Sequence, residues 1–531
     1  MCRFFNYYSS ICTGENTPAA FTYDPFIISI KEMLVSELQQ IVYYIEKLKD
    51  LNINMSIYTD KVIDFISTLI VNLDFKKESF FIIIEDLNTN KKNLEKMYLT
   101  ECENRKIQAE LLEKQPIDFS SKKSILKALN KNEKNINVNN FQLNKNKKTL
   151  YEIMINLVLN ACNCLIELKK FNSDFPQAKN MVLKLLNSSN SPSLNENDLI
   201  DTIRDFSKCN YQIMKLIYEK IVEKFGPVIK TKVPLHQKKG KAILVSGSSY
   251  SDLEKLLSAC EKYDINVYTH RNMISAFQYE KLTVHPNLTG SYEQSENNMF
   301  IDFASFPGPI FVSKNAILKT DVIRGQIYTS AKYPAYGIGK IENDDFSPVI
   351  QYALEAKGFE KNEKERTFEV GYFETDVEHM LSEIINKYNK KEINRILIIG
   401  LSDGFNQKDD YVKSFIKDAS KDDYIISFAF NASRHNFCHI NSYYDYSLLY
   451  RIIETLFEKL EDANSKLGVF FADCCPDVIS HIFNLISLNV NNIFLGPCCP
   501  NVINPVLYEG LSDIFSVNEI TEPLDDIEKI S

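Results

Sequence analysis

Two pairs of adjacent cysteines are the residues of this chain whose types best suit chemistry. Cys474-Cys475 follows the short apolar run LGVFFAD, and Cys498-Cys499 follows NNIFLGP. Both runs are typical of β-strands, so the four thiols are expected on the same edge of one sheet. Soft thiolates hold zinc or iron-sulfur clusters, and His435, Cys438 and His439 are expected in a nearby loop. Adjacent cysteines rarely both ligate one ion, because successive side chains diverge, and buried structural thiols are the competing interpretation.

Ser402 is a second candidate, in the turn GLSDG after the run RILIIG. G-x-S-x-G is the nucleophile elbow of serine hydrolases, in which a helix starts directly beneath the serine. Here FNQKDD separates the turn from the helical pattern YVKSFIKDA, so a glycine-bounded turn capped by Asp403 is the alternative. His270 ends the run INVYTH and could act as a base or as a hydrogen-bonded structural group. The sequence contains neither G-x-G-x-x-G nor a Walker phosphate loop, so nucleotide binding has no direct support.

The elements that must position these residues change in type near residue 230. From Asp24 to about Gly226, apolar residues recur at intervals of three and four, which predicts stacked helices. After Lys230, short β-branched runs alternate with helical patterns, the signature of parallel sheets with crossover helices. The runs are KAILVSG, INVYTH, GPIFVSK, RILIIG, YIISFAF, LGVFFAD and NNIFLGP.

The sequence therefore predicts a multidomain α and α/β fold. We expect an N-terminal helical bundle domain over residues 1–230, with an Asn- and Lys-rich surface insertion at about 129–148. Two Rossmann-like parallel α/β domains are expected over 231–362 and 363–531, divided within the charged segment AKGFEKNEKERTF. In such sheets, function collects at the carboxyl ends of the strands.

The composition is that of an ordinary globular protein with a mildly acidic surface. The 531 residues carry a formal net charge of -9, with 44% hydrophobic and 25% charged residues. We expect no nucleic-acid partner, because no basic face is evident, and no membrane segment, because no apolar run approaches the ~18 residues needed. The N-terminus lacks a secretory pattern and the twelve cysteines suit free thiols, so a cytoplasmic location is expected.

A collinear set of segments resembles the hybrid-cluster protein family, the hydroxylamine reductases or prismane proteins. The set includes TKVPLHQKKGKAILVSGSSYSDLEKLL, INVYTHRNMISAFQYEKLTVHPNLTGSY, FASFPGPIFVSKNAI, DDFSPVI, RILIIGLSDG and LISLNVNNIFLGP. The resemblance implies a helical domain followed by two Rossmann-like domains. It also implies an iron-sulfur cluster near the N-terminus and, where the three domains meet, a hybrid iron-sulfur-oxygen cluster that reduces hydroxylamine or nitric oxide.

At the positions where the resemblance implies cluster ligands, this chain has other residues. The family's histidine falls on Ser248 and its glutamate on Asn272, its cysteines fall on Ala316, Ser402 and Phe430 and near Ser442, and its E-x-K motif falls near Cys475 and Asp477. Its N-terminal four-cysteine motif is matched only by Cys2 and Cys12. These two are remnants at best, because two thiolates cannot hold a four-iron cluster that takes four.

We therefore expect a degenerate hybrid-cluster protein, because Ala, Phe and Ser remove the anionic ligands that offset the metal charge. It would have no intact metal site, no cofactor and no catalytic residue, and would serve as a non-catalytic scaffold or binding protein. An unknown protein partner or a small ligand in the vacated cavity is expected, and a dimer is possible. One alternative is an active hydroxylamine or nitric oxide reductase-type oxidoreductase, with a remodelled iron-sulfur or metal site built from Cys438 and the two cysteine pairs. A second alternative is a serine hydrolase that uses Ser402.

Overall fold

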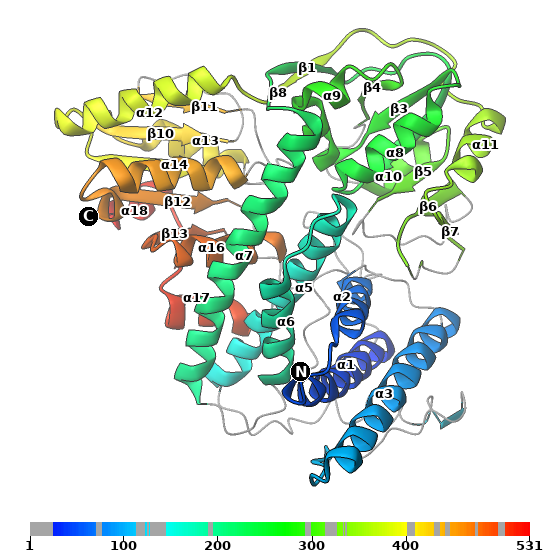
Figure 1. Cartoon of the computed structure of the whole chain (residues 1–531). Helices are drawn as coiled ribbons and strands as arrows, with labels where there is room; N and C mark the ends of the chain where they lie inside the picture. Colours follow the sequence, from blue (N-terminus) through cyan, green and yellow to red (C-terminus); the bar gives the residue numbers. More distant parts are fainter. Residues whose placement is uncertain are drawn as a thin grey trace.

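The computed structural model places a group of long helices beside two α/β units (Figure 1). It describes residues 25–70, 77–112, 123–124, 127, 145–188, 195–292, 299–313, 326–332, 334, 337–400, 409–428, 436–440, 446–472, 476–496 and 505–530. The long helix α7 runs between the second α/β unit and the other helices in Figure 1, and its last turn reaches the first α/β unit.

Six long helices form the described portion of the N-terminal part. They are α1 Pro25–Asp50, α2 Ser56–Ile70, α3 Lys77–Arg105, α5 Lys145–Lys170, α6 Pro176–Ser188 and α7 Glu196–Phe225. Apolar residues at helical spacing bury one face of each, as Leu34, Leu38, Ile41 and Ile45 do on α1. A capping box, in which Asn195 and Asp198 each satisfy the other's backbone N–H, fixes the start of α7.

The structure corrects one limit of the predicted Asn- and Lys-rich insertion at 129–148. Residues 145–148 form the first turn of α5, because lysine is a good helix former and the apolar periodicity continues directly from Thr149. Residues 129–144 lie outside the described part of the chain.

One described helical segment, Thr149–Lys170 in α5, is long and apolar enough to cross a membrane, with a mean hydropathy of 1.4. Its most apolar window is 82% buried against other elements of the protein. Helix α5 packs on α2, α6, α7, α16 and α17. Burial of α5 in the core of the protein therefore accounts for its apolar composition.

The first α/β unit is a six-stranded parallel sheet in the order β4-β3-β2-β5-β6-β7. Its strands are β2 Lys241–Ser246, β3 Ile265–Thr269, β4 Leu288–Ser291, β5 Ile310–Val312, β6 Ile327–Thr329 and β7 Gly339–Lys340. Its helical segments are α8 Tyr250–Cys260, η3 Arg271–Gln278, α9 Glu280–Thr283, α10 Met299–Ser305 and α11 Ser347–Glu355. Alternate residues of β2 enter different cores, Ile243 on one face and Leu244 on the other, so both faces are covered.

The second α/β unit repeats this plan in the order β11-β10-β9-β12-β13-β14, again with all strands parallel. Its strands are β9 Arg395–Ile399, β10 Asp423–Ser427, β11 Phe437–His439, β12 Leu467–Phe471, β13 Asn492–Leu495 and β14 Asn518–Glu519. Its helices are α12 Glu374–Asn389, α13 Asp409–Asp418, α14 Tyr446–Lys459, α15 Ala463–Lys466, α16 Pro476–Ser487, α17 Pro505–Phe515 and α18 Pro523–Glu528. The predicted multidomain α and α/β fold is confirmed.

A small antiparallel pair flanks the first sheet in the sequence, because β1 Thr231–Pro234, before β2, pairs with β8 Thr367–Val370, after β7. The sequence pattern did not predict this pair. It also missed the short strands β4, β6, β7, β11 and β14, which are too brief to show a period of their own. The domain limits at residues 230 and 362 stay predictions.

The apolar cores are distributed unevenly among the three parts. One continuous core joins the helical part to one face of the second sheet, through α7, α14 and α16. The first sheet has two cores of its own. The end of α7 enters the larger of these cores: Phe225 contacts Phe171 and Tyr250 of α8, and Ile221 and Val222 pack against the same core. The first α/β unit therefore depends more than the second on other contacts for its attachment.

Candidate functional site

The carboxyl edge of the first sheet has a topological switch between β2 and β5. The chain adds β3 and β4 on one side of β2, and β5 to β7 on the other. In open parallel sheets, ligands bind in the crevice outside the strand ends at such a point. Gly247, with φ 118°, lets the chain turn sharply after β2, and Ser249 caps the N-terminus of α8. The exposed Ser248 lies between them.

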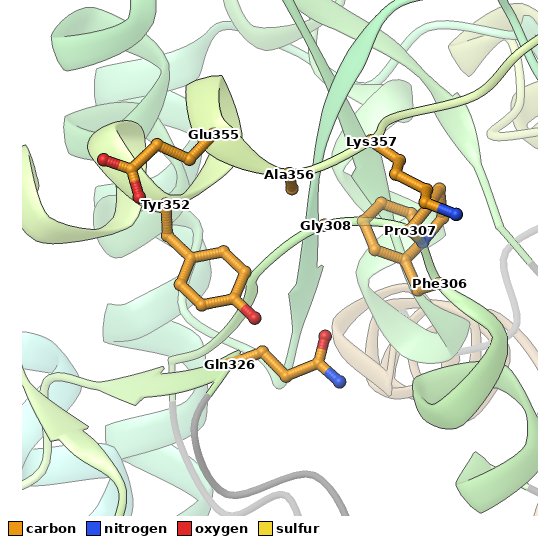
Figure 2. Close-up of a pocket in the computed structure, with 8 residues that line it drawn as sticks. All are labelled: Phe306, Pro307, Gly308, Gln326, Tyr352, Glu355, Ala356 and Lys357. Carbon is orange, nitrogen blue, oxygen red and sulfur yellow. The ribbon is translucent and has the colours of Figure 1, made fainter.

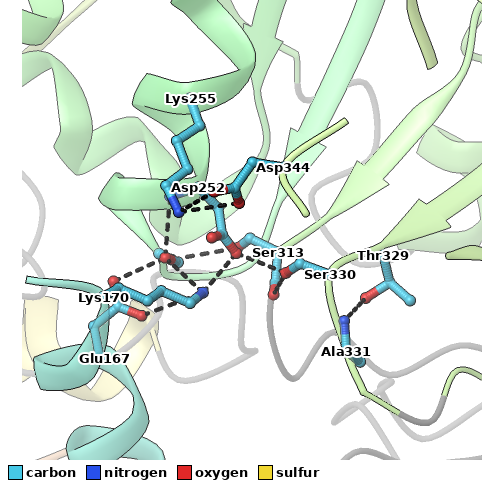
Figure 3. A network of polar contacts seen from close by, with 10 residues as sticks. Glu167, Lys170, Asp252, Lys255, Ser313, Thr329, Ser330, Ala331 and Asp344 are labelled. Atoms are coloured by element: carbon cyan, nitrogen blue, oxygen red, sulfur yellow. Dashed lines mark hydrogen bonds and ion pairs between the residues drawn. The ribbon is translucent and has the colours of Figure 1, made fainter. Parts of the chain in front are cut away.

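A charged side chain from the helical part reaches this edge (Figure 3). Lys170, the last residue of α5, places its Nζ 2.6 Å from Oδ2 of Asp252 and donates a 3.1 Å hydrogen bond to Oγ of Ser249. Glu167, one turn earlier on α5, accepts a 2.8 Å hydrogen bond from Ser249 Oγ. Its Oε2 lies 3.7 Å from the Lys170 ammonium. The ammonium is therefore paired with two carboxylates.

The ends of two further strands complete the arrangement. Ser330, just after β6, donates to Asp252 Oδ2 at 2.7 Å, or to the carbonyl of Ser313 at 3.1 Å. Ser313, just after β5, accepts a 3.3 Å hydrogen bond at its Oγ from the backbone N–H of Ser249. We call this set the Lys170 network, and its members are Glu167, Lys170, Ser249, Asp252, Ser313 and Ser330. It joins α5 to the carboxyl ends of β2, β5 and β6.

Burial and charge act in opposite directions on Lys170. Only 19% of its side chain is exposed, with 10% of Glu167 and 4% of Asp252. Burial lowers the pKa of Lys170, but attraction to Glu167 and Asp252, with the hydrogen bonds they accept, outweighs that effect and raises the pKa above its ordinary value. The side chain is thus a fixed cation at neutral pH. No sequence signal pointed to it, because Lys170 and Asp252 are 82 residues apart.

His270, at the same edge, has both ring nitrogens hydrogen-bonded. Its Nδ1 lies 3.1 Å from Oγ of Ser246 and its Nε2 lies 3.1 Å from Oδ2 of Asp302. The assignment that satisfies all three groups has Nε2–H donating to the carboxylate and the Ser246 hydroxyl donating to Nδ1. The order Ser-His-Asp matches a hydrolase relay, but 4% of Ser246 and none of His270 is exposed, which leaves a substrate no approach. The structure favours a structural role for His270, and sequence reasoning missed both of its partners.

The carboxyl edge of the second sheet has its own switch, between β9 and β12. Phe471 and Leu495 are register partners at the ends of β12 and β13, so the segments leading to the two cysteine pairs leave neighbouring strands at one edge. The described residues do not include Cys474, Cys475, Cys498, Cys499, Ser402, Phe430, Ser442, Ala316, His435, Cys2 or Cys12. Asn272 lies in η3 and Asp477 in α16, and their side chains, with that of His439, are likewise outside the described part.

Cys438, on the edge strand β11, is a candidate thiol that the structure does describe. Burial, with the nearby carboxylates of Asp376 and Glu383, raises its pKa to about 11. The thiol is therefore protonated at neutral pH unless a cation displaces its proton. Within the described ranges, no three His, Cys, Asp or Glu side chains come together as a group that could hold a metal ion.

A buried polar cluster joins α7 to the second α/β unit. Asn210 donates hydrogen bonds to Oγ of Ser480 at 2.8 Å and to Oδ1 of Asn484 at 2.7 Å. The Asn484 amide donates in turn to the hydroxyl of Tyr450 at 2.9 Å, and that hydroxyl lies 2.5 Å from Nδ1 of His481. Burial lowers the pKa of His481 to about 3, so its ring is neutral and accepts the Tyr450 proton. The cluster fixes the packing of these helices, since it presents no exposed group.

The first sheet also carries a pocket of about 450 Å³ at its opposite edge. It is lined by Phe306, Pro307, Gly308, Gln326, Tyr352, Glu355, Ala356 and Lys357. Figure 2 shows the Tyr352 hydroxyl and the Gln326 side chain facing the same space, with Phe306 and Pro307 across from them. Gly308 precedes β5 and Gln326 precedes β6, so this pocket lies at the amino ends of the strands, away from the Lys170 network. Among the described residues that line it there is neither a cysteine nor a histidine.

The family model of the Prismane/CO dehydrogenase family matches residues 23–441, which is most of the chain. The chain belongs to this family. A match of that extent includes the helical part, the whole first sheet and the start of the second. The predicted relationship to the hybrid-cluster proteins is therefore confirmed.

Curated relatives agree over a shorter stretch of this prismane-family chain. The hydroxylamine reductase of Methanocella arvoryzae is 33% identical over 222 residues, which cover 42% of this chain and 41% of that protein. That of Thermodesulfovibrio yellowstonii is 32% identical over 209 residues, 39% of each. The aligned part thus spans about two fifths of the length of these relatives.

A solved structure resembles the whole chain at the level of the fold. It is described as NiZn[Fe4S4] and NiNi[Fe4S4] clusters in closed and open alpha subunits of acetyl-CoA synthase/carbon monoxide dehydrogenase. The TM-score is 0.50 at 10% identity, over 100% of this chain and 87% of that one. At this identity the likeness concerns the fold.

Proposed function

We propose that this prismane-family chain is a degenerate hydroxylamine reductase-like protein. It lacks the cluster ligands of its relatives and serves as a non-catalytic scaffold or binding protein. The observation that carries the proposal is the carboxyl edge of the first sheet. Ser248 stands at the position of the family's iron-binding imidazole, and the residue beside it, Ser249, is tied to the Lys170 ammonium.

The residues at this edge do not fit an iron-sulfur-oxygen cluster. A serine hydroxyl is neutral and short, and it cannot replace an imidazole nitrogen as a ligand. The two carboxylates of the Lys170 network, Glu167 and Asp252, are already engaged with Lys170 and with neighbouring hydroxyls. The Lys170 ammonium already occupies the place between these carboxylates that an added cation would take. We therefore derive no reaction step through a metal here.

The test is the metal content of the protein after anaerobic purification. The hydroxylamine reductase of Methanocella arvoryzae, carried through the same iron and sulfide reconstitution, is the positive control. We expect a colourless protein with far less than one iron per chain, without charge-transfer absorption, and without hydroxylamine reduction above the protein-free rate. A brown protein with several irons per chain would contradict the proposal.

The alternative is an active reductase-type oxidoreductase with a remodelled site built from Cys438 and the two cysteine pairs. It predicts iron uptake on reconstitution and turnover that is lost in Cys475→Ala. The pKa of the Cys438 thiol is raised, so a metal must displace its proton before the sulfur can act as a ligand. This requirement weakens metal binding by Cys438. No observation on the described residues favours the serine hydrolase that would use Ser402.

A further inference from the structure

We propose that the Lys170 network is a metal-independent clamp that holds the first α/β unit on the long helices. In this proposal the Lys170 ammonium is the positive charge at a sheet edge where the family places a metal site. The statement about the metal rests on the function proposed above. The clamp itself rests on the geometry and charges of the six network residues.

The contacts are those of a clamp because they join elements that no local sequence pattern connects. Glu167 and Lys170 come from the last turn of α5, in the helical part. Ser249 and Asp252 come from the first turn of α8, which follows β2. In Figure 3 the Lys170 side chain extends from its helix toward the α8 turn, where it meets the Asp252 carboxylate. Moving the two units apart would break these contacts together.

The charges make such a separation costly. Two carboxylates and one ammonium are largely removed from water here, with at most 19% of any of the three side chains exposed. A buried pair of this kind contributes little net stability relative to an apolar contact of the same shape, but removing one partner leaves an uncompensated buried charge. The ammonium is therefore required once Glu167 and Asp252 are present.

The distribution of apolar cores gives the clamp its importance. The second α/β unit shares one continuous core with several of the long helices, whereas the cores of the first unit meet the long helices chiefly at the end of α7. There Phe225 contacts Phe171 and Tyr250, and Ile221 and Val222 pack against the same core. Phe171 follows Lys170 in the sequence, and Tyr250 follows Ser249. The Lys170 network is the polar half of this same contact. Its loss should loosen the first unit and leave the second unit unchanged.

Hydrogen exchange of the full-length protein, read by mass spectrometry, tests the clamp. Lys170→Met removes the ammonium and keeps an unbranched side chain close to the length of the lysine's apolar stem. The matched control is Lys169→Met, because the neighbouring Lys169 side chain is 63% exposed and lies 3.7 Å from Asp60 outside the network. We expect Lys170→Met to speed exchange about a hundredfold in the last turn of α5 and the first turn of α8. In Lys170→Met, hydrogen exchange in α12 and α14 should match that of the wild type. In Lys169→Met, exchange in every segment should match that of the wild type.

A charge-balanced variant separates the clamp from a general loss of packing. Lys170→Met combined with Glu167→Gln and Asp252→Asn carries no buried charge, so exchange in both turns should return most of the way to the wild-type rate. If Lys170→Met alone does not fold, this triple variant and Lys170→Arg should fold. The clamp would be overturned if hydrogen exchange in Lys170→Met were unchanged from the wild type. It would also be overturned if the triple variant exchanged as fast in the two turns as Lys170→Met does.

A chelator distinguishes the clamp from the proposed function. Exchange of the wild type in the two turns should be the same before and after treatment with EDTA. Faster exchange after EDTA would show that a metal holds this edge, and would overturn the clamp. Iron found elsewhere in the chain, with these turns insensitive to EDTA and opened by Lys170→Met, would overturn the proposed function and leave the clamp standing.

Discussion

The buried His481 should make the protein sensitive to mild acid, and replacing it by asparagine should remove that sensitivity. The ring is 5% exposed, its Nδ1 faces the Tyr450 hydroxyl, and Tyr446 stacks on it with ring centroids 3.4 Å apart. Burial lowers its pKa from 6.5 to about 3. In His481→Asn, the side-chain oxygen can still accept the Tyr450 proton but does not titrate.

The sign follows from which state binds the proton. Above pH 6.5 the ring is neutral in both the folded and unfolded states, so it adds no pH dependence. As the pH falls from 6.5 toward 3, the unfolded chain binds a proton that the folded one excludes, and stability is lost throughout that window. At about pH 4.5 the loss amounts to about 3 kcal/mol, at roughly 1.4 kcal/mol for each pH unit below the unfolded pKa.

Urea unfolding followed by circular dichroism, at about pH 7.5 and about pH 4.5, measures this loss. Between the two conditions, the wild type should lose about 3 kcal/mol more than His481→Asn. His379→Asn, at an exposed position on α12, is the matched control and should lose as much as the wild type. The variant itself should be about 1 kcal/mol less stable at neutral pH, because the stacking on Tyr446 is lost. Equal acid losses in the wild type and His481→Asn would refute the reasoning.

Two further expectations concern the sheet edges. Gly496→Ala should destabilise the second α/β unit by more than about 2 kcal/mol in urea unfolding, since the added methyl would meet rigid backbone. The new Cβ would lie 2.0 Å from the carbonyl oxygen of Ala472, so an unchanged midpoint would contradict the close approach of β12 and β13. A fluorophosphonate probe should leave Ser246 unmodified in the folded protein, because its hydroxyl is buried against His270. Peptide mapping that finds the label on Ser246 would show that the Ser-His-Asp chain is reachable and reactive.

Local pattern is sufficient for much of this fold. Apolar spacing of three and four residues along α1 and α5 predicts helices, since only that period brings such residues to one face. Runs such as KAILVS in β2 and LGVFF in β12 are buried on both faces, so they show a continuous apolar sequence that predicts a parallel sheet. Because parallel strands end at one edge, the sequence also located the turns after β2, β9, β12 and β13.

The contacts at those edges required the tertiary structure. Nothing near Lys170 in the sequence indicates Asp252 as its partner, and nothing near His270 indicates Asp302. These pairs form where a helix end or a strand end happens to meet a distant turn, and side-chain identity at single positions carries no period that could predict the meeting. The comparison of Ser248 with an iron-binding histidine came from the family resemblance and not from any local pattern. The tertiary structure decided that an ammonium lies beside it, because only the folded chain brings Lys170, at the end of α5, to the buried Asp252 carboxylate of the α8 turn.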